Sequence, residues 1–257
     1  MDELDSFIEN AFSLVMSGYY ATGQKRTVPV KSLTSSIASA DRIPVIAEFK
    51  RRTPSVRDIS SDADITERLT AFANAGICGF SILTEPHRFD GSLANISAAS
   101  AFGLPVIMKD FIIATDQVDA AYRLGADAVL LIMDIFERSR FNIDVLMEDI
   151  HTAGMEAVLE VNSSEQFAAA METEADIIGI NNRNLSDLTL EERRVEKVLA
   201  GAAKDRPVIG MSGVTSPLQV MSMLDAGADA VLVGTSLMGG STALLDGIKE
   251  AVLKRRK

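Results

Sequence analysis

Charged side chains end several otherwise apolar stretches of this sequence, and the first of these stretches is the most informative. Residues 44–50, Pro-Val-Ile-Ala-Glu-Phe-Lys, form strands readily and end with a carboxylate and an ammonium group two positions apart. The alternation of a strand places Glu48 and Lys50 on one side, together with Ile46. In a strand buried on both faces, such charges must face each other or a ligand, because burying an unpaired charge is costly. We therefore expect a polar site at this strand end; the alternative is a surface strand with a polar outer face.

The charge balance limits the class of ligand. The chain has 257 residues, with 36 acidic and 25 basic side chains and a formal net charge of −11. This charge argues against a nucleic-acid surface. An anionic ligand would need a local cluster of Lys, Arg and backbone N–H groups to overcome the global field. No stretch approaches the ~20 apolar residues of a membrane span, and the acidic N-terminus does not resemble a signal peptide. We expect a cytoplasmic protein that binds neither nucleic acid nor membrane.

Cysteine and histidine are too scarce for several common kinds of site. The single cysteine, Cys78, allows no intrachain disulfide and favours a reducing compartment. The two histidines, His87 and His151, have no metal-ligand spacing to it. A zinc site and a Ser-His-Asp triad are therefore disfavoured, and we expect no metal. Proton transfer would fall to lysine and glutamate.

Two short signatures repeat along the chain and predict its strands. Pro-Val-Ile occurs at Pro44, Pro105 and Pro207, and a pair of small or acidic residues precedes an apolar run four times, about 50 residues apart. That spacing is the length of two βα units. Together with Met155-Glu-Ala-Val-Leu-Glu160, the two series predict eight strands, near 45–50, 78–83, 105–109, 127–132, 155–160, 176–181, 207–212 and 229–234.

Amphipathic segments alternate with these strands. We expect helices at Asp64–Ala75, Asp116–Leu124, Ser164–Glu172, Pro217–Ala226 and Thr242–Leu253. Such alternation predicts a parallel sheet covered on both faces, and eight units favour a closed (β/α)8 barrel over a doubly wound sheet. The Gly-Ala-Asp-Ala repeats are interpreted as helix ends with a glycine C-cap. No GxGxxG or P-loop pattern occurs.

The first 43 residues precede the barrel. A helix is expected from about Glu3 to Ser17, a loop from Gly18 to Thr27 and a short helix from Lys31 to Ala40. This segment is too small for a separate domain. We predict an α/β fold with one TIM-barrel domain over residues 1–257, in which 1–43 are an N-terminal helical extension and 44–257 supply the eight βα units.

In this fold the active site lies at the carboxyl ends of the strands. Those ends carry Glu48, Lys50, Thr84, Glu85, Lys109, Asp110, Met133, Glu160, Asn181, Arg183, Ser212, Gly213, Gly234, Thr235 and Ser236. Lysine and glutamate there suit proton transfer; a purely structural ring of ion pairs is the alternative. Small residues after the last two strands suit a phosphate held by backbone N–H groups, with a short helix near Thr235–Met238.

Several of these stretches resemble indole-3-glycerol phosphate synthase, and the resemblance covers nearly the whole chain after residue 40. The Lys-Asp-Phe and Ile-Asn-Asn-Arg-Asn-Leu stretches are the most specific, since no general barrel constraint demands them. The stretches are Ile46-Ala-Glu-Phe-Lys-Arg-Arg-Thr-Pro-Ser55, Ser81-Ile-Leu-Thr-Glu85, Phe89-Asp-Gly-Ser92, Pro105-Val-Ile-Met-Lys-Asp-Phe-Ile112, Leu159-Glu-Val161 and Gly179-Ile-Asn-Asn-Arg-Asn-Leu185.

The resemblance implies a reaction that needs no metal or organic cofactor. The substrate would be 1-(2-carboxyphenylamino)-1-deoxyribulose 5-phosphate, which is cyclised, decarboxylated and dehydrated to indole-3-glycerol phosphate. Lys109 would be the general acid and Glu160 would move protons in the dehydration. Lys50 would lie near the substrate's carboxylate or phosphate and could share the acid role. Glu48 would hold both lysines.

The resemblance assigns further residues to substrate binding. Asn181 would orient the sugar hydroxyls. Phe89, Phe111 and Leu185 would wall the aromatic ring. Further contacts with the substrate are expected from Thr53, Leu131 and Arg183. The phosphate would be held by Ser212, Gly213, Gly234 and Thr235, with Lys50, and Ser212 is also counted with the catalytic group.

The sequence departs from the family pattern at three places. Thr53 stands where serine is commoner, and Val56-Arg57 replaces Lys-Gly in the loop after the first strand. Met211 stands where a glutamate usually precedes Ser-Gly, which removes a carboxylate from the seventh strand end. Two alternatives stay open: another phosphate-binding barrel such as phosphoribosylanthranilate isomerase, which works with a Cys and Asp pair, and a non-catalytic barrel subunit. We expect a monomer, with other tryptophan-pathway enzymes as candidate partners.

Overall fold

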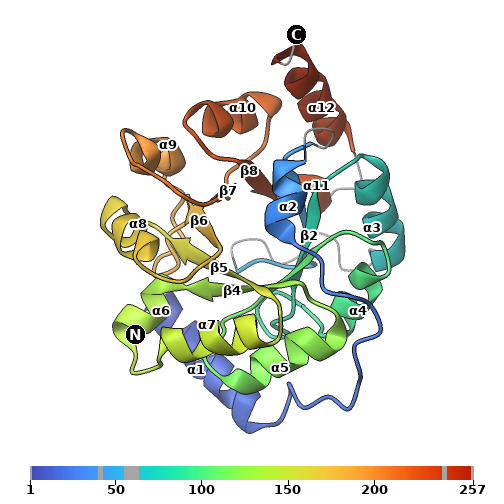
Figure 1. Ribbon diagram of the computed structural model, residues 1–257, viewed down its shortest axis with the longest axis vertical. Helices are drawn as coiled ribbons and strands as arrows, with labels where there is room; N and C mark the ends of the chain where they lie inside the picture. Colours follow the sequence, from blue (N-terminus) through green and yellow to red (C-terminus); the bar gives the residue numbers. More distant parts are fainter. Residues whose placement is uncertain (1, 40–42, 55–63, 239–241, 256–257) are drawn as a thin grey trace.

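Eight parallel strands pair in chain order and close into a barrel in the computed structural model, which describes residues 2–39, 43–54, 64–238 and 242–255 (Figure 1). The predicted barrel is confirmed, and the predicted strand bounds agree to within one or two residues. The strands are β1 Val45–Phe49, β2 Gly79–Leu83, β3 Val106–Lys109, β4 Ala128–Ile132, β5 Glu156–Val161, β6 Ile177–Asn181, β7 Val208–Met211 and β8 Ala230–Val233.

Helices surround the barrel, and the five predicted between strands are all present (Figure 1). The second helix is shorter than the expected Lys31–Ala40, and Ala40 lies outside the described residues. The helices are α1 Glu3–Met16, α2 Leu33–Ala38, α3 Ile65–Asn74, α4 Ala94–Ser100, α5 Thr115–Leu124, α6 Met133–Arg138, α7 Ile143–Thr152, α8 Ser164–Met171, α9 Arg194–Leu199, α10 Pro217–Asp225, α11 Thr235–Met238 and α12 Ala243–Arg255. None of the helices in the described part of the chain is long and apolar enough to cross a membrane.

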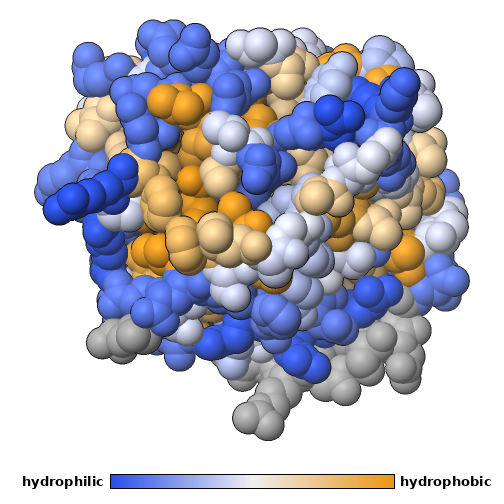
Figure 2. Space-filling model, turned by 90° about the horizontal axis from the view of Figure 1, so that it is seen from below, coloured by the Kyte–Doolittle hydropathy of each residue, from blue (hydrophilic) through white to orange (hydrophobic). Residues whose placement is uncertain are grey.

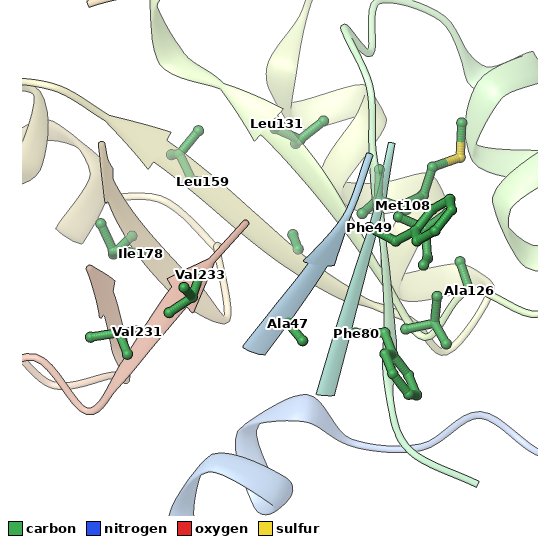
Figure 3. Close-up of a cluster of buried hydrophobic side chains, with 14 of the residues drawn as sticks. Ala47, Phe49, Phe80, Met108, Ala126, Leu131, Leu159, Ile178, Val231 and Val233 are labelled. Carbon is green, nitrogen blue, oxygen red and sulfur yellow. The ribbon is translucent and has the colours of Figure 1, made fainter. Parts of the chain in front are cut away.

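The strands separate two apolar layers. Val45, Ala47 and Phe49 of β1 belong to the large outer cluster that the helices cover, and Figure 3 shows part of this cluster on successive strands. Ile46 belongs to a second cluster with Leu130 of β4 and other residues that fill the barrel. The alternation inferred from the sequence therefore holds, and it leaves Glu48 and Lys50 on the inner side.

The N-terminal extension contacts both ends of the barrel. From α1, Asn10 donates to the Glu85 carboxylate at the end of β2 at 2.9 Å. At the opposite end, the Glu156 carboxylate at the start of β5 accepts the Leu33 N–H of α2 at 2.8 Å. The outer side of α1 exposes Phe12 and Met16. Figure 2 views the molecule from the α1 edge of Figure 1 and shows several apolar patches among polar residues.

The repeated aspartates hold neighbouring strands in register. The carboxylates of Asp127, Asp176 and Asp229 each accept the N–H of the first or second residue of the preceding odd-numbered strand, at 2.7–3.0 Å. The preceding Gly125 and Gly227 have φ angles of 101° and 114°, which confirms the expected left-handed conformation at these helix ends. The repeat thus ends a helix and ties the next strand to its neighbour.

Removing one of these carboxylates tests how far burial determines its contribution to the free energy of unfolding. Asp127 is fully buried and also binds the Arg26 guanidinium at 2.5 Å, so Asp127→Ala should lower the free energy of unfolding by about 3–5 kcal/mol. The Asp229 side chain is 38% exposed, so Asp229→Ala should cost only about 1 kcal/mol. Urea unfolding at an unchanged m-value measures both losses. Equal losses would show that burial does not decide the contribution.

Candidate active site

A cavity of about 350 Å³ lies at the carboxyl ends of the strands. Fifteen residues expected at the site from the sequence line this cavity, and they come from six strands and the loops that follow them. They are Glu48, Lys50, Thr53, Phe89, Lys109, Asp110, Phe111, Asn181, Arg183, Leu185, Ser212, Gly213, Gly234, Thr235 and Ser236. Closure of the barrel is what collects them, because carboxyl ends of parallel strands meet at one rim.

Two lysine–glutamate pairs form the polar centre. Lys50 pairs with Glu48 on β1, and the Lys109 Nζ lies 3.2 Å from the Glu160 Oε2 across β3 and β5. Both glutamates are 3% exposed, whereas both lysines line the open cavity. An ammonium group has three donors, so each lysine keeps donors for a ligand after pairing. The centre therefore presents two lysine side chains held by buried carboxylates.

Asn181 completes this centre from β6. Its Nδ2 donates to the Glu160 Oε1 at 2.7 Å, so both oxygens of that carboxylate have partners. Its Oδ1 accepts the Arg183 N–H at 2.9 Å, which fixes the amide orientation. Glu160 thus acts on the cavity through Lys109 and Asn181.

Arg183 is directed partly into its own loop. Its Nη1 donates to the Leu188 carbonyl at 2.7 Å, and Arg183 forms an antiparallel bridge with Leu190. This folds residues 183–190 into a narrow turn in which Leu188 has a φ of 60°. Leu188 and Leu190 line the cavity beside Leu185, and sequence reasoning missed both. Only the chain reversal brings them to the rim.

Two phenylalanines form an aromatic wall with support from α1. The rings of Phe89 and Phe111 lie 6.1 Å apart, and Phe7 stacks on Phe111 at 4.4 Å with an interplanar angle of 14°. The Glu85 carboxylate accepts the Phe89 N–H at 3.0 Å and so holds the loop that carries this ring. The sequence predicted only that this segment is a helix, from about Glu3 to Ser17. A helical pattern gives no indication that Phe7 has a partner more than 100 residues away.

Small residues after β7 and β8 leave backbone accessible at the rim. Ser212 and Gly213 have φ angles of 68° and 80°, a left-handed pair that is costly for serine and common at functional sites. A Cβ on Gly234 would lie 3.0 Å from the Lys50 Nζ and would collide with the Glu48 carboxylate. The short helix α11 begins at Thr235, as the sequence predicts. Gly234 therefore gives the Glu48–Lys50 pair its space.

Leu131 does not contribute to the cavity, in contrast to the sequence-based expectation. Its side chain is fully buried in the outer cluster, between β4 and the helices. Ile132, one residue later, points inward and lines the cavity instead. Every residue of β4 is apolar and buried, so the sequence carries no mark of which alternate set faces inward. The Val56-Arg57 departure lies outside the described residues.

Met211 occupies the floor of the cavity. It is 1% exposed and belongs to the inner cluster with Leu232. Its sulfur would lie 3.1 Å from a Cβ on Gly179, so the thioether fills the space above that glycine. The seventh strand end therefore supplies an apolar surface and no carboxylate.

No group of three or more His, Cys, Asp or Glu side chains within the described ranges could hold a metal ion. Within the same residues, the polar groups at the cavity include the two lysines with their glutamate partners, Asn181, and the hydroxyl and backbone groups of the rim. The side chains of Asp110, Arg183, Glu192 and Gln219 also line it. The chemistry that this arrangement supports is proton transfer by lysine and glutamate beside an aromatic wall.

Comparison with known proteins identifies the family. The model of the family described as indole-3-glycerol phosphate synthase matches residues 14–246. The chain belongs to the indole-3-glycerol phosphate synthase family. An enzyme of that name from Sulfurisphaera tokodaii is 38% identical over 216 residues, covering 83% of this chain and 86% of that protein. One from Halobacterium salinarum is 38% identical over 221 residues, with 83% and 84% covered.

These matches confirm the expectation of a carboxy-lyase of tryptophan biosynthesis. A solved structure of an N-acetylmannosamine-6-phosphate 2-epimerase from Clostridium perfringens has a TM-score of 0.59 at 13% identity, covering 90% of this chain and 98% of that one. At that identity the likeness concerns the fold alone. Membership of the synthase family therefore rests on sequence similarity alone, whereas the fold is supported by both sequence and structural similarity.

Met211 provides a test of the strand register at the site. Because Met211 lines the same open cavity as Lys50 and Lys109, we expect Met211→Glu to fold with a loss of less than about 2 kcal/mol in the free energy of unfolding. Met108 is fully buried in the outer cluster, so Met108→Glu should lose more than about 4 kcal/mol or fail to fold. Circular dichroism and urea unfolding compare the two variants. Failure of both to fold would place Met211 in packed core and β7 in another register.

Proposed function

We propose that this cavity converts 1-(2-carboxyphenylamino)-1-deoxyribulose 5-phosphate to indole-3-glycerol phosphate, with release of CO2 and water. The observation that carries the proposal is the pair of buried carboxylates that hold Lys50 and Lys109 at one cavity. An aromatic wall lies at the same cavity, together with the small residues of the strand ends. These three surfaces suit the carboxylate, the aromatic ring and the phosphate of a single substrate.

Lys109 is the general acid of ring closure in this proposal. The aromatic carbon that bears the carboxylate attacks the ketone carbon of the ribulose chain, and the carbonyl oxygen takes a proton from the ammonium group. Loss of CO2 then returns an electron pair to the ring and restores its aromaticity. Pairing with Glu160 at 3.2 Å holds the Lys109 Nζ in place at the cavity.

Glu160 and Asn181 serve the later dehydration. The ring carbon next to the one that bears the new hydroxyl loses a proton to the carboxylate of Glu160. That proton passes through the neutral Lys109 to the hydroxyl, which leaves as water. Asn181 holds that carboxylate at 2.7 Å and orients the sugar hydroxyls. Ser212 stands at the neighbouring strand end and is assigned to the same group.

The remaining residues bind and position the substrate. Lys50 attracts the carboxylate or the phosphate, and Glu48 fixes its ammonium group. Phe89, Phe111 and Leu185 press the aromatic ring against the sugar chain, with Thr53 and Arg183 at the rim. Bringing the two reacting carbons together in an apolar place promotes both ring closure and loss of the carboxylate.

Backbone N–H groups of the last two strand ends bind the phosphate. Ser212, Gly213, Gly234 and Thr235 form this part of the rim, and their small side chains allow an anion to approach the main chain. Lys50 adds a positive charge beside Gly234. That local charge offsets the net negative charge of the protein.

We also propose that the enzyme works as a monomer in the cytoplasm, with other enzymes of the tryptophan pathway as candidate partners. The formal charge of −11 and the single buried cysteine support this part of the proposal.

Substitution of the two lysines separates acid catalysis from anion binding. Lys109→Met keeps most of the side-chain volume but removes the proton donor, so kcat should fall by roughly 10²–10⁴-fold. Lys50→Met should raise KM as well, because that residue is also assigned to an anionic group of the substrate. Single-turnover formation of the indole, followed by its fluorescence, measures ring closure directly.

Lys25→Met is the matched control, since Lys25 is exposed in the extension, and it should leave both constants unchanged. If Lys109→Met closes the ring at the wild-type rate, Lys109 is not the general acid and the role passes to Lys50.

Gly234 tests the phosphate site. Gly234→Ala should raise KM several-fold by displacing the Glu48–Lys50 pair, and Gly234→Asp should raise it by roughly tenfold or more through added repulsion of the phosphate. Gly23→Ala is the control, because a Cβ there meets no atom within 4 Å. Steady-state kinetics across the substrate range gives all three values. An unchanged KM in Gly234→Asp would argue against a phosphate at this rim.

A further inference from the structure

A tyrosine of the N-terminal extension reaches the strand that carries Lys109. Tyr20 follows α1, is 2% exposed, and donates its hydroxyl to the Asp110 Oδ2 at 3.0 Å. The two residues are 90 positions apart in the chain. Asp110 is 3% exposed and directly follows Lys109. The contact therefore connects the extension to the backbone that positions the proposed general acid.

The Asp110 carboxylate joins three segments. The Thr84 hydroxyl at the end of β2 donates to Oδ2 at 2.5 Å, and the Phe111 N–H donates to Oδ1 at 2.8 Å. Thr84 in turn donates its backbone N–H to the Lys109 carbonyl at 3.1 Å. Two hydroxyl groups thus share one carboxylate oxygen, and an ionised oxygen accepts such bonds more strongly than a neutral one. Protonation of Asp110 would weaken this set.

We propose that Asp110 is a positioning residue, which in its ionised form, held by the Tyr20 and Thr84 hydroxyls, fixes the end of β3 so that Lys109 faces Glu160 and the substrate. The inference rests on the proposed role of Lys109. It gives the extension a part in catalysis that is separate from the stacking of Phe7 on Phe111. Asp110 lines the same cavity, but both of its oxygens already accept bonds from Tyr20, Thr84 and the Phe111 N–H, so we assign it no proton transfer to the substrate.

The surroundings of Asp110 make its ionisation sensitive to pH. Burial raises the pKa of Asp110 to about 6, against the hydrogen bonds from Thr84, the Phe111 N–H and Tyr20, which lower it, while Glu85 raises it. Burial and the Asp110 charge also raise the pKa of both Tyr19 and Tyr20, so the two phenols stay protonated as donors. The groups that face Asp110 are thus Thr84 and Glu85 from the loop after β2, Tyr19 and Tyr20 from the extension, and the Phe111 N–H.

A fall in pH changes the stability of the folded chain and the catalytic rate in opposite directions. Between its ordinary pKa of 3.8 and about 6, Asp110 binds a proton more readily in the folded chain than in the unfolded chain. This group therefore adds stability as the pH falls through that window. Activity should fall over the same window, because the ionised form positions Lys109. Loss of kcat near pH 6 is then not a sign of unfolding.

The test compares two adjacent tyrosines. Tyr20→Phe removes the hydroxyl that binds the carboxylate, whereas Tyr19→Phe removes one that donates to the Thr84 carbonyl at 2.9 Å. In Tyr20→Phe we expect kcat to fall by roughly tenfold with KM unchanged, the equivalent of one hydrogen bond to an ionised group. The acid limb of its kcat profile should move to higher pH, because a bond that lowers the pKa of Asp110 is lost. In Tyr19→Phe, kcat should stay within about twofold of the wild-type value, and the acid limb of its pH profile should not move.

Thr84→Val provides a second variant that removes the other hydroxyl from the same oxygen, and it should move kcat and the acid limb in the same direction. A wild-type acid limb in both Tyr20→Phe and Thr84→Val would overturn the inference, as would equal changes in Tyr19→Phe and Tyr20→Phe. The proposed function is judged separately by indole formation in the wild-type protein, and the role of Lys109 by Lys109→Met. If Lys109→Met is inactive while Tyr20→Phe matches wild type, the positioning role alone fails. If the wild-type protein forms no indole from the substrate, the proposed function fails.

Discussion

The pairing of β1 with β8 is the constraint on which the rest of the structure depends. The Val231 N–H donates to the Pro44 carbonyl at 2.8 Å, and Val45 lies opposite Val231 in the register. This ladder removes both free edges of the sheet and brings the first strand end beside the last. Gly234 consequently lies against the Glu48–Lys50 pair, although six of the eight strands lie between them in the sequence. An open sheet with the same strands would leave the proposed phosphate rim far from that pair.

Closure also sets the electrostatics of the site. Glu48 and Glu160 are almost fully buried inside a barrel that is otherwise filled by apolar side chains, and each would be costly there without a cation. The lysines offset that cost and in return are held in fixed positions at the edge of the cavity. The arrangement exchanges some stability for preorganised proton donors, as expected of a catalytic site on rigid strands. The same logic accounts for Met211, whose apolar side chain packs over Gly179 where a further charge would need another partner.

The N-terminal extension holds the barrel at both ends and has different chemistry at each. At the amino end, the Glu156 carboxylate holds α2 against the barrel, and this contact contributes to the stability of the fold. At the carboxyl end, α1 and the loop after it supply Phe7 behind the aromatic wall and Tyr20 beneath Asp110. Both residues act on groups that border the cavity without forming its surface. The extension is thus part of the site as well as part of the fold.

Sequence alone determined the strands, their number and the charged residues that end them, because strand alternation and the repeated Gly-Ala-Asp signature are local patterns. It also placed Lys50, Lys109, Asn181 and Gly234 at one rim, since the barrel topology brings all strand ends together. Only the tertiary structure decided which side of β4 faces inward, where Leu131 and Ile132 are equally apolar, and which lysine pairs with which glutamate. The same holds for Phe7 and Tyr20, whose partners are about 100 positions away. Contacts of this kind depend on how distant segments pack, and no pattern within a single segment encodes them.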